Sequence, residues 1–220
     1  LFIELICEEI PARMQKNSII HMAKFISSEL LEYGLVDRSS ASKTKSAIGP
    51  KHMAVSLSGV LKQQVDKVFE KRGPKVSAPQ QAIDGFCKSV GILESELVTK
   101  QTAKGAFYFA VIVEKGRHIE TVIPELVYNL VAEFPWPKSQ RWGTSRIRWV
   151  RPLHHINVVL DGKLLRGSLD LGGDMTIEFT NAGYGHSAYH STSFEISGFE
   201  LYVNKMRELD VLVVFEERQS

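Results

Sequence analysis

Short apolar runs alternate along this chain with segments in which apolar residues recur at intervals of three and four positions. The first pattern is typical of strands and the second of amphipathic helices. Strands are predicted at residues 1–6, 53–57, 65–70, 106–113, 156–160, 163–169, 176–179 and 211–215. Helices are predicted between Pro11 and Gly34, from Pro79 to Val90, over 119–131 and over 201–209. This alternation predicts an α/β or α+β fold, built on a mixed sheet with helices packed on it.

Local signals make four of these predictions more specific. The nearly continuous apolar run 106–113 indicates a strand that is buried on both faces. The pair Asp161-Gly162 between two strands is the clearest hairpin signal, and Ser197 begins a pattern that resembles a helix capping box. Residues 36–50 are rich in Ser, Lys and Thr and end in Gly-Pro, so we predict a loop there.

Composition excludes several classes of protein. With 220 residues, 44% of them apolar, the chain can bury a core in one large or two small domains. The 27 Lys and Arg nearly balance the 25 Asp and Glu, which excludes a polycationic or an acidic tail protein. No apolar stretch approaches the roughly 18 residues of a membrane span, and no signal-peptide pattern begins the chain. We therefore expect a cytoplasmic protein without membrane contact, in which Cys7 and Cys87 are reduced thiols.

Residues 136–155 combine aromatic and basic side chains without one acidic residue. The segment holds Trp136, Lys138, Arg141, Trp142, Arg146, Arg148, Trp149 and Arg151, and so all three tryptophans of the chain. Arginine forks bind phosphate oxygens and flat aromatic faces stack on unpaired bases, which favours an RNA-contacting surface. The alternative is that the tryptophans anchor a core or an interface, with arginines stacked on them or paired with distant carboxylates.

A second basic region covers residues 38–75, where nine Lys and Arg stand against two acidic residues. Within it, Lys71-Arg72-Gly73-Pro74 is predicted to form a turn that presents two adjacent cations at its tip. Such a tip suits a phosphate group. The alternative is an ordinary solvated basic face.

Seven histidines raise the question of a metal or hydrolase site. His154 and His155 on one strand would point to opposite faces, so their spacing does not let them ligate one ion. The chain has no Gly-x-Ser-x-Gly, His-Glu-x-x-His or Cys-x-x-Cys motif and no phosphate-binding glycine loop. We therefore expect no metal, no nucleotide site and no independent catalysis. The pair Glu8-Glu9 is interpreted either as an acid–base pair or as negative charge near the start of a helix.

Six separated stretches together resemble one known family. They are residues 1–12 (LFIELICEEIPA), 71–74 (KRGP), 136–143 (WPKSQRWG), 148–154 (RWVRPLH), 185–186 (GH) and 215–218 (FEER). In order and spacing they are similar to the amino-terminal part of the β subunit of bacterial heterotetrameric glycine–tRNA ligase. Each stretch alone is a weak signal, but the six together are specific.

The resemblance implies an aminoacyl-tRNA synthetase of two α and two β chains. In that family the α chain activates glycine with ATP and Mg²⁺, while the β chain recognises tRNA and is required for charging. This chain is then expected to be an amino-terminal fragment that binds no cofactor and holds no complete active site. The resemblance also implies that residues 1–190 form an α/β module with up to two sub-lobes, like the B3/B4 module of the phenylalanine–tRNA ligase β chain. Residues 191–220 would begin a following helical region.

The chain departs from the family pattern at several positions. Gly185-His186-Ser187-Ala188 stands where the family has Gly-His-Arg-Phe, so the arginine of that motif is missing, and His155 stands where the family has Trp.

The residues that we expect to contact glycine tRNA or the α chain are Lys71, Arg72, Arg141, Trp142, Arg146, Arg148, Arg151 and His154. The sequence does not separate these two partners. Two alternatives stay open. One is a hydrolase that removes wrong amino acids from tRNA, as the similar module does in the phenylalanine enzyme, with His154, His186 or a nearby serine in a pocket. The other is a scaffold for the α chain that touches no RNA.

Overall fold

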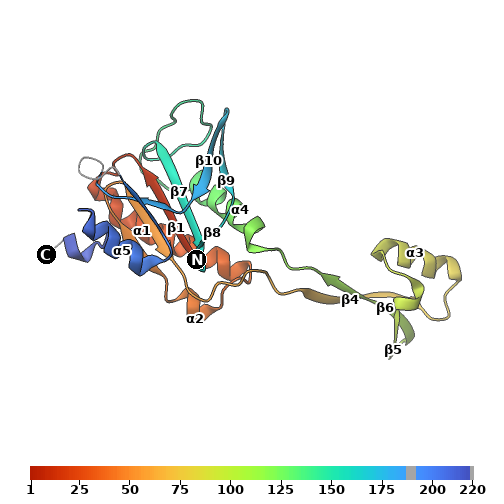
Figure 1. Ribbon diagram of the computed structural model, residues 1–220. Coiled ribbons are helices and arrows are strands. Elements are labelled where there is room, and N and C mark those ends of the chain that lie inside the picture. Colours follow the sequence, from red (N-terminus) through yellow and green to blue (C-terminus); the bar gives the residue numbers. More distant parts are fainter. Residues whose placement is uncertain (187–191, 219–220) are drawn as a thin grey trace. The chain divides into compact units, whose positions relative to one another are not determined.

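The computed structural model describes residues 1–186 and 192–218. The chain divides into two compact units, the main unit (Leu1–Gln63 and Arg117–Ser220) and the inserted unit (Gln64–Gly116). Each unit combines helix with sheet (Figure 1), which confirms the predicted α/β class. The predicted boundary between residues 190 and 191 lies outside the described residues and stays a prediction.

The main unit is built on a mixed sheet. Its strands are β1 (Phe2–Cys7), β2 (Lys45–Ile48), β3 (His52–Ser56), β7 (Leu153–Leu160), β8 (Lys163–Leu164), β9 (Ser168–Gly172) and β10 (Met175–Thr180), with a separate pair of β11 (Ala182–Tyr184) and β12 (Ser193–Glu195). The strand order is β2-β3-β1-β7-β10-β9, and β8 pairs with β7. β10 runs parallel to β7, whereas β1 runs antiparallel to both of its neighbours. The predicted mixed sheet is therefore confirmed.

The helices of the main unit are α1 (Ala12–Glu32), α2 (Arg38–Ala41), α4 (Ile119–Ala132) and α5 (Phe199–Glu208), with a 3₁₀ turn η2 (Glu216–Arg218). α1 follows Pro11, whose fixed φ suits a helix start. It ends before Gly34, which has a φ of +68°. The amide of Leu35 donates to the carbonyl of Leu30 at 2.9 Å, and that of Gly34 donates to Leu31 at 3.0 Å. This pair of bonds is the Schellman closure that a left-handed glycine permits.

β1 is buried along its whole length, because both faces of the sheet are covered. Its residues Ile3 and Leu5 join the larger of two apolar clusters, and Phe2 joins the smaller one. Successive side chains of a strand point to opposite faces, so one strand serves both clusters. α5 closes the smaller cluster with Tyr202 and Met206.

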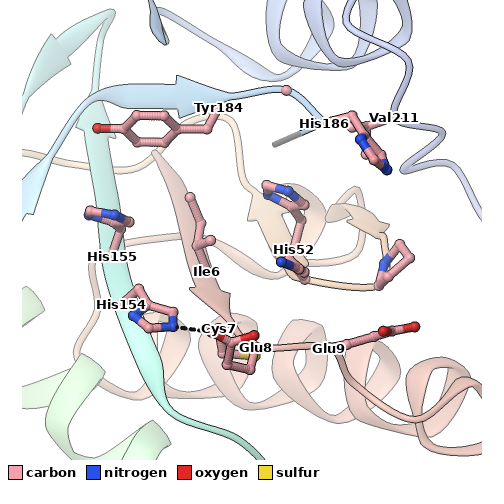
Figure 2. Close-up of a pocket in the computed structure, with 13 residues that line it drawn as sticks. Ile6, Cys7, Glu8, Glu9, His52, His154, His155, Tyr184, His186 and Val211 are labelled. Carbon is pink, nitrogen blue, oxygen red and sulfur yellow. Dashed lines mark hydrogen bonds and ion pairs between the residues drawn. The ribbon is translucent and has the colours of Figure 1, made fainter. Parts of the chain in front are cut away.

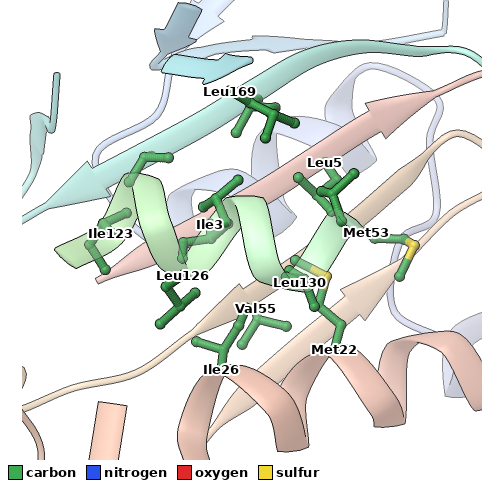
Figure 3. Packing of buried hydrophobic residues seen from close by; sticks show 14 of the residues in the cluster. Ile3, Leu5, Met22, Ile26, Met53, Val55, Ile123, Leu126, Leu130 and Leu169 are labelled. Atoms are coloured by element: carbon green, nitrogen blue, oxygen red, sulfur yellow. The ribbon is translucent and has the colours of Figure 1, made fainter. Parts of the chain in front are cut away.

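α1 and α4 cover the face of the larger cluster. Figure 3 shows Met22 and Ile26 of α1 and Leu126 of α4 beside Ile3 of β1 and Val55 of β3. All five side chains are almost completely buried. This interlayer packing is the main apolar contribution to the stability of the unit.

The inserted unit is smaller and consists of β4 (Lys67–Lys75), α3 (Gln80–Val90), a 3₁₀ turn η1 (Glu94–Glu96), β5 (Val98–Thr102) and β6 (Gly105–Glu114). The strand order is β4-β6-β5, with both pairs antiparallel. α3 ends at Gly91, whose φ of +73° confirms the predicted stop. β5 was not predicted, because Val-Thr-Lys-Gln-Thr carries little apolar signal.

The prediction that residues 106–113 are buried on both faces is wrong. Only Phe107 and Ala110 of this run are buried, while Val111 and Val113 are exposed. The inserted unit has three strands and one regular helix, so it contains too few elements to cover both faces of β6.

Three local predictions are also wrong. Residues 36–50 are not a plain loop, because they contain α2 and β2, and Asp37 Oδ1 caps α2 by accepting the amide of Ser40 at 2.7 Å. α5 begins after Gly198 without a side-chain cap, so the capping box at Ser197 does not form. Residues 211–215 form no strand. The carbonyl of Val213 accepts one hydrogen bond, from the amide of Ile48 in β2, and the segment forms no ladder with that strand.

The hairpin predicted at Asp161-Gly162 is confirmed. Both residues have positive φ, 49° and 77°, as a two-residue turn of the primed type requires. The turn joins β7 to β8, but β8 spans only two residues. The predicted strand 163–169 is therefore divided, and its second part belongs to β9, which pairs with β10.

Candidate functional site

The tryptophans of residues 136–155 pack in or against the core of the main unit. Trp149 is fully buried, with its ring centroid 4.9 Å from that of Phe134 and 5.0 Å from that of Trp136. Trp136 also stacks on Phe134, and Trp142 is half-buried against the larger cluster. The interpretation of these residues as core anchors is therefore the correct one for Trp149.

The arginines of the same segment lie on an exposed loop. Gln140 and Trp149 exchange both backbone hydrogen bonds, at 2.8 and 3.0 Å, so the residues between them project from this bridge. The four exposed arginines are Arg141, Arg146, Arg148 and Arg151. Among the described residues, none of the four forms an ion pair. The positive charge of Arg141, Arg146 and Arg148 is therefore available to a partner, whereas Arg151 interacts electrostatically with Glu8 and lines a pocket with Glu8 and Glu9.

Arg148 is the exception in its hydrogen bonding. Its guanidinium donates to the carbonyl of Ser139 at 2.6 Å and to the Ser139 hydroxyl at 3.2 Å. These bonds hold the Arg148 side chain against Ser139 of the same loop.

Lys71 and Arg72 belong to the inserted unit, and the predicted turn tip is wrong. Both lie within β4, and Gly73-Pro74 produces an irregularity between Arg72 and Lys75 rather than a reversal. The Arg72 guanidinium lies 3.7 Å from the centroid of the Phe107 ring. Arg72 therefore covers an aromatic face of its own unit.

An aromatic pocket of about 520 Å³ lies beside α1. Phe134 and Trp136 line it together with His21, and Arg13 and Lys138 supply two cations. No acidic residue is among its lining residues, all of which the structure describes. A flat ring system next to unneutralised positive charge is the chemistry that unpaired bases favour.

A second pocket, of about 410 Å³, lies where β1, β3 and β7 meet the end of β11, and Figure 2 shows its lining. We call it the histidine pocket, because His52, His154, His155 and His186 line it. Its charged residues are Glu8, Glu9 and Lys51. Ser187 and Ala188, which follow His186, lie outside the described residues.

The expectation that His154 and His155 point to opposite faces is wrong. Ile6 pairs with His155 and Cys7 with Leu153, so His154 is the extra residue of a β-bulge. Both imidazoles consequently line the histidine pocket, with their ring centroids 6.5 Å apart (Figure 2).

Two contacts hold these rings. His154 Nε2 lies 2.9 Å from Oε1 of Glu8, and this hydrogen bond holds the pKa of the Glu8 carboxyl below its ordinary value. His155 stacks on Tyr184 with centroids 5.1 Å apart. Burial, with a smaller effect from His154, lowers the pKa of His155, so its imidazole is neutral at neutral pH.

Both cysteines are free thiols, as predicted. Cys7 lies in the floor of the histidine pocket, and burial raises its pKa to about 12. The thiol therefore stays protonated and is not a nucleophile at neutral pH.

A buried polar network next to the pocket escaped the sequence analysis. The Glu4 carboxylate is completely buried, with Nδ1 of His52 at 2.9 Å and Nδ2 of Asn157 at 2.8 Å. The hydroxyl of Tyr202 donates to Glu4 at 2.6 Å. The sequence did contain one signal for this network, because Glu4 interrupts the apolar run of β1. A carboxylate in a buried strand needs polar partners.

Neither pocket holds a recognisable metal site. Among the described residues, no group of three His, Cys, Asp or Glu side chains has the geometry to hold an ion. No described helix is long and apolar enough to cross a membrane.

Comparison with known proteins identifies the family. A family profile described as "Glycyl-tRNA synthetase beta subunit" matches residues 1–220. A glycine–tRNA ligase β subunit from Rhodospirillum centenum is 34% identical over 240 residues, which covers 100% of this chain and 33% of the relative. The same subunit from a Ruegeria species is 36% identical over 224 residues (100% and 31%), and that from Rickettsia conorii is 32% identical over 220 residues (100% and 32%). This chain thus spans about a third of the length of these relatives. Because profile and relatives match it from end to end, the chain belongs to the family of glycyl-tRNA synthetase β subunits.

Proposed function

We propose that this chain contributes tRNA recognition and α-subunit assembly to a glycine–tRNA ligase, which attaches glycine to its tRNA with ATP. Family membership supports this enzyme class. In this proposal two α and two β chains assemble, and ATP and Mg²⁺ act at the α chain. The residues of this chain then supply contacts rather than chemistry. A cytoplasmic location and a likeness of residues 1–190 to the B3/B4 module belong to the same proposal.

The observation that carries the RNA role is the uncompensated positive charge around the Gln140–Trp149 bridge. Arg141 and Arg146 are exposed and have no carboxylate partner among the described residues. Phosphate groups release counterions when they meet such cations, which drives binding. The aromatic pocket adds ring faces between Arg13 and Lys138. We assign the phosphate contacts to the arginines and base stacking to this pocket.

The test is a titration of this chain with glycine tRNA and with an unrelated tRNA at two salt concentrations. We expect Arg141→Ala and Arg146→Ala to weaken binding of both tRNAs, because phosphate contacts carry little sequence information. Each lost contact should lower the salt slope by about one. Lys45→Ala is the matched control, because Lys45 is an exposed cation already paired with Glu200 at 2.7 Å.

Measurement of α-chain binding by the same variants separates the two partners. Loss of α-chain binding with an unchanged salt slope for tRNA would assign the arginines to the protein interface. If neither partner responds to Arg141→Ala or Arg146→Ala more than to the control, the proposed role of this loop is wrong.

The hydrolase alternative has one supporting observation, which is that His154 and His186 line the same pocket. No serine is among the lining residues that the structure describes. Release of an amino acid from mischarged tRNA by this chain, and its loss in His186→Ala, would support that alternative over a contact role.

A further inference from the structure

A β-bulge in the inserted unit brings two cations of β4 over one aromatic ring. Arg72 pairs with Phe109 of β6 and Lys75 pairs with Phe107, so β4 advances three residues while β6 advances two. In a regular strand, positions three apart point to opposite faces of the sheet. The extra residue of the bulge instead places Arg72 and Lys75 on the same face, which is the face of Phe107 and Phe109.

Gly73 and Pro74 make this bulge a fixed feature of β4. A Cβ atom at Gly73 would lie 2.5 Å from the ring of Phe86 in α3, so no side chain fits there. Pro74 has no backbone N–H and cannot donate to the ladder between β4 and β6. Lys71 points to the other face from Arg72, because successive residues of a strand alternate. The two adjacent cations Lys71 and Arg72 therefore do not act on one ligand.

The Arg72 guanidinium is held by its flat face and not by its N–H groups. Its Cζ lies 3.7 Å from the centroid of the Phe107 ring, and Nζ of Lys75 lies 5.9 Å from the same centroid. Phe107 is buried, whereas both cations are exposed. Among the described residues, neither cation makes an ion pair or a side-chain hydrogen bond. The N–H donors of Arg72 are therefore free although its position is set by the ring.

Positive charge exceeds negative charge on this side of the sheet. Lys100 of β5 lies opposite Phe107, and Glu70 of β4 lies opposite Val111, so both belong to the face of Arg72 and Lys75. Glu70 is already paired with Lys100 at 2.5 Å. We call this side, with its charged residues Glu70, Arg72, Lys75 and Lys100, the basic face. Two like charges over one ring repel each other, and an anion between them relieves this repulsion.

The arrangement suits a phosphate group better than a carboxylate. A guanidinium donates two parallel hydrogen bonds to two oxygens of a phosphate. A phosphate group has a further oxygen for the ammonium group of Lys75, and a terminal phosphate carries up to two negative charges. A carboxylate has two oxygens and one charge, which Arg72 alone would satisfy.

We infer that the basic face binds a phosphate group, to which Arg72 donates two hydrogen bonds and Lys75 donates one, while Phe107 positions the guanidinium. The phosphate group belongs either to an RNA backbone or to a small phosphate compound. Only the RNA source rests on the proposed function. The site itself does not, because it lies in the inserted unit and the proposed loop of arginines lies in the main unit.

The first test is ¹H–¹⁵N NMR of this chain with inorganic pyrophosphate as the probe. We expect pyrophosphate to shift the signal of the Arg72 Nε–H group. Potassium acetate at equal ionic strength is the control and should leave this signal in place. An equal response to acetate would show that a phosphate group is not required and would overturn the inference, as would no response to millimolar pyrophosphate.

The second test compares variants of exposed residues in β4. Arg72→Lys keeps the charge but loses the planar fork, so pyrophosphate affinity should fall about tenfold, as for a lost hydrogen bond between charged groups. Lys75→Gln should weaken binding severalfold. Lys67→Gln is the matched control, because Lys67 is an exposed cation of the same strand and lies opposite Glu114, on the other face. Equal losses in Lys67→Gln and Lys75→Gln would refute a specific site.

The positioning role of Phe107 has its own readout. Phe107→Leu keeps an apolar side chain and every charge of the basic face, but removes the ring beneath Arg72. In the free protein, the Arg72 Nε–H signal should lose the shift that the ring causes, and pyrophosphate affinity should fall. An unchanged affinity in the folded variant would disprove this role of Phe107.

The source of the phosphate group is identified by measuring the binding of glycine tRNA to Arg72→Lys. Weaker binding of both tRNA and pyrophosphate would support the site and identify an RNA backbone. Weaker binding of pyrophosphate alone would support the site and identify a small phosphate compound. Pyrophosphate binding is measured without tRNA, so failure of this site and failure of the proposed function are separate results.

Discussion

The main unit and the inserted unit use similar strands to different effect. β1 of the main unit contains a glutamate, yet all six of its residues are buried. β6 of the inserted unit contains a longer apolar run, yet most of it is at least partly exposed. Residues 64–116, all described, bury only Ile83, Phe107 and Ala110. The comparison shows that coverage by other elements decides the burial of a strand, and that its own apolar content does not.

Charged groups differ between the units in the same way. In the main unit the Glu4 carboxylate is sealed in a network. In the inserted unit Glu70 pairs with Lys100 on the surface, with both side chains more than 40% exposed. Solvent screens the second arrangement and not the first.

The largest effect is expected from breaking the buried network. Glu4→Ala leaves His52, Tyr202 and Asn157 without their partner, so the free energy of unfolding should fall by about 3–5 kcal/mol. Glu70→Ala is the matched change in the inserted unit and should cost no more than about 1 kcal/mol. Urea denaturation of both variants measures the difference. Similar losses in the two would show that burial of the carboxylate is not what matters.

The second prediction separates the two cores. Leu126→Ala should lower the stability of the main unit by about 3 kcal/mol, because it leaves a cavity between α4 and the sheet. Tryptophan fluorescence reports this directly, since all three tryptophans lie in the main unit. Ile83→Ala removes one of three buried side chains of the inserted unit and should speed amide exchange in β4 and β6. A shift of the tryptophan transition by Ile83→Ala would contradict independent cores.

The cysteines provide a third, smaller comparison. Burial raises the pKa of Cys7 to about 12, so its thiol is protonated at pH 8, whereas Cys87 of the inserted unit is only partly buried. A thiol reagent at pH 8 should modify Cys87 and spare Cys7 until the protein unfolds. Mass spectrometry of labelled peptides locates the reaction, with Cys87→Ser as the control. Labelling of Cys7 before the protein unfolds would show that the core of the main unit is accessible to the reagent.

The smallest effect concerns two exposed carboxylates. The hydrogen bond to His154 lowers the pKa of Glu8 in the main unit, and that to Lys115 lowers the pKa of Asp66 in the inserted unit. A carboxyl whose pKa is lowered in the folded state stabilises the fold when the pH is above its ordinary pKa. This stability is lost as the pH falls through the lowered pKa. His154→Ala should therefore raise the pKa of Glu8, and Lys115→Ala that of Asp66, in NMR titrations. If the pKa of the carboxyl does not change in a variant, the contact removed in that variant is not the cause of the lowered pKa.

The sequence correctly predicted helix ends and one turn, because these features depend on the residues at the position itself. Pro11 and Gly34 delimit α1, Gly91 ends α3, and Asp161-Gly162 forms its hairpin, because each depends on backbone angles that the residue itself favours. The candidate arginines are exposed for a similarly local reason, since charged side chains seldom lose water without a partner.

The site depended on contacts that neighbouring residues do not reveal. Alternation along a strand sends His154 and His155 to opposite faces, but the register of β7 against β1 inserts a bulge and brings both into one pocket. Glu4 and Tyr202 are separated by 198 residues and meet only because α5 packs on the sheet.

The sequence by itself determined the class of fold, the ends of several helices and the basic character of residues 136–155. Only the tertiary structure decided which apolar strand is covered, which tryptophan is buried and which nitrogen of His52 contacts Glu4. The physical reason is that backbone preference and hydropathy are properties of single residues. Burial, strand register and hydrogen-bond partnership arise only when distant segments pack together.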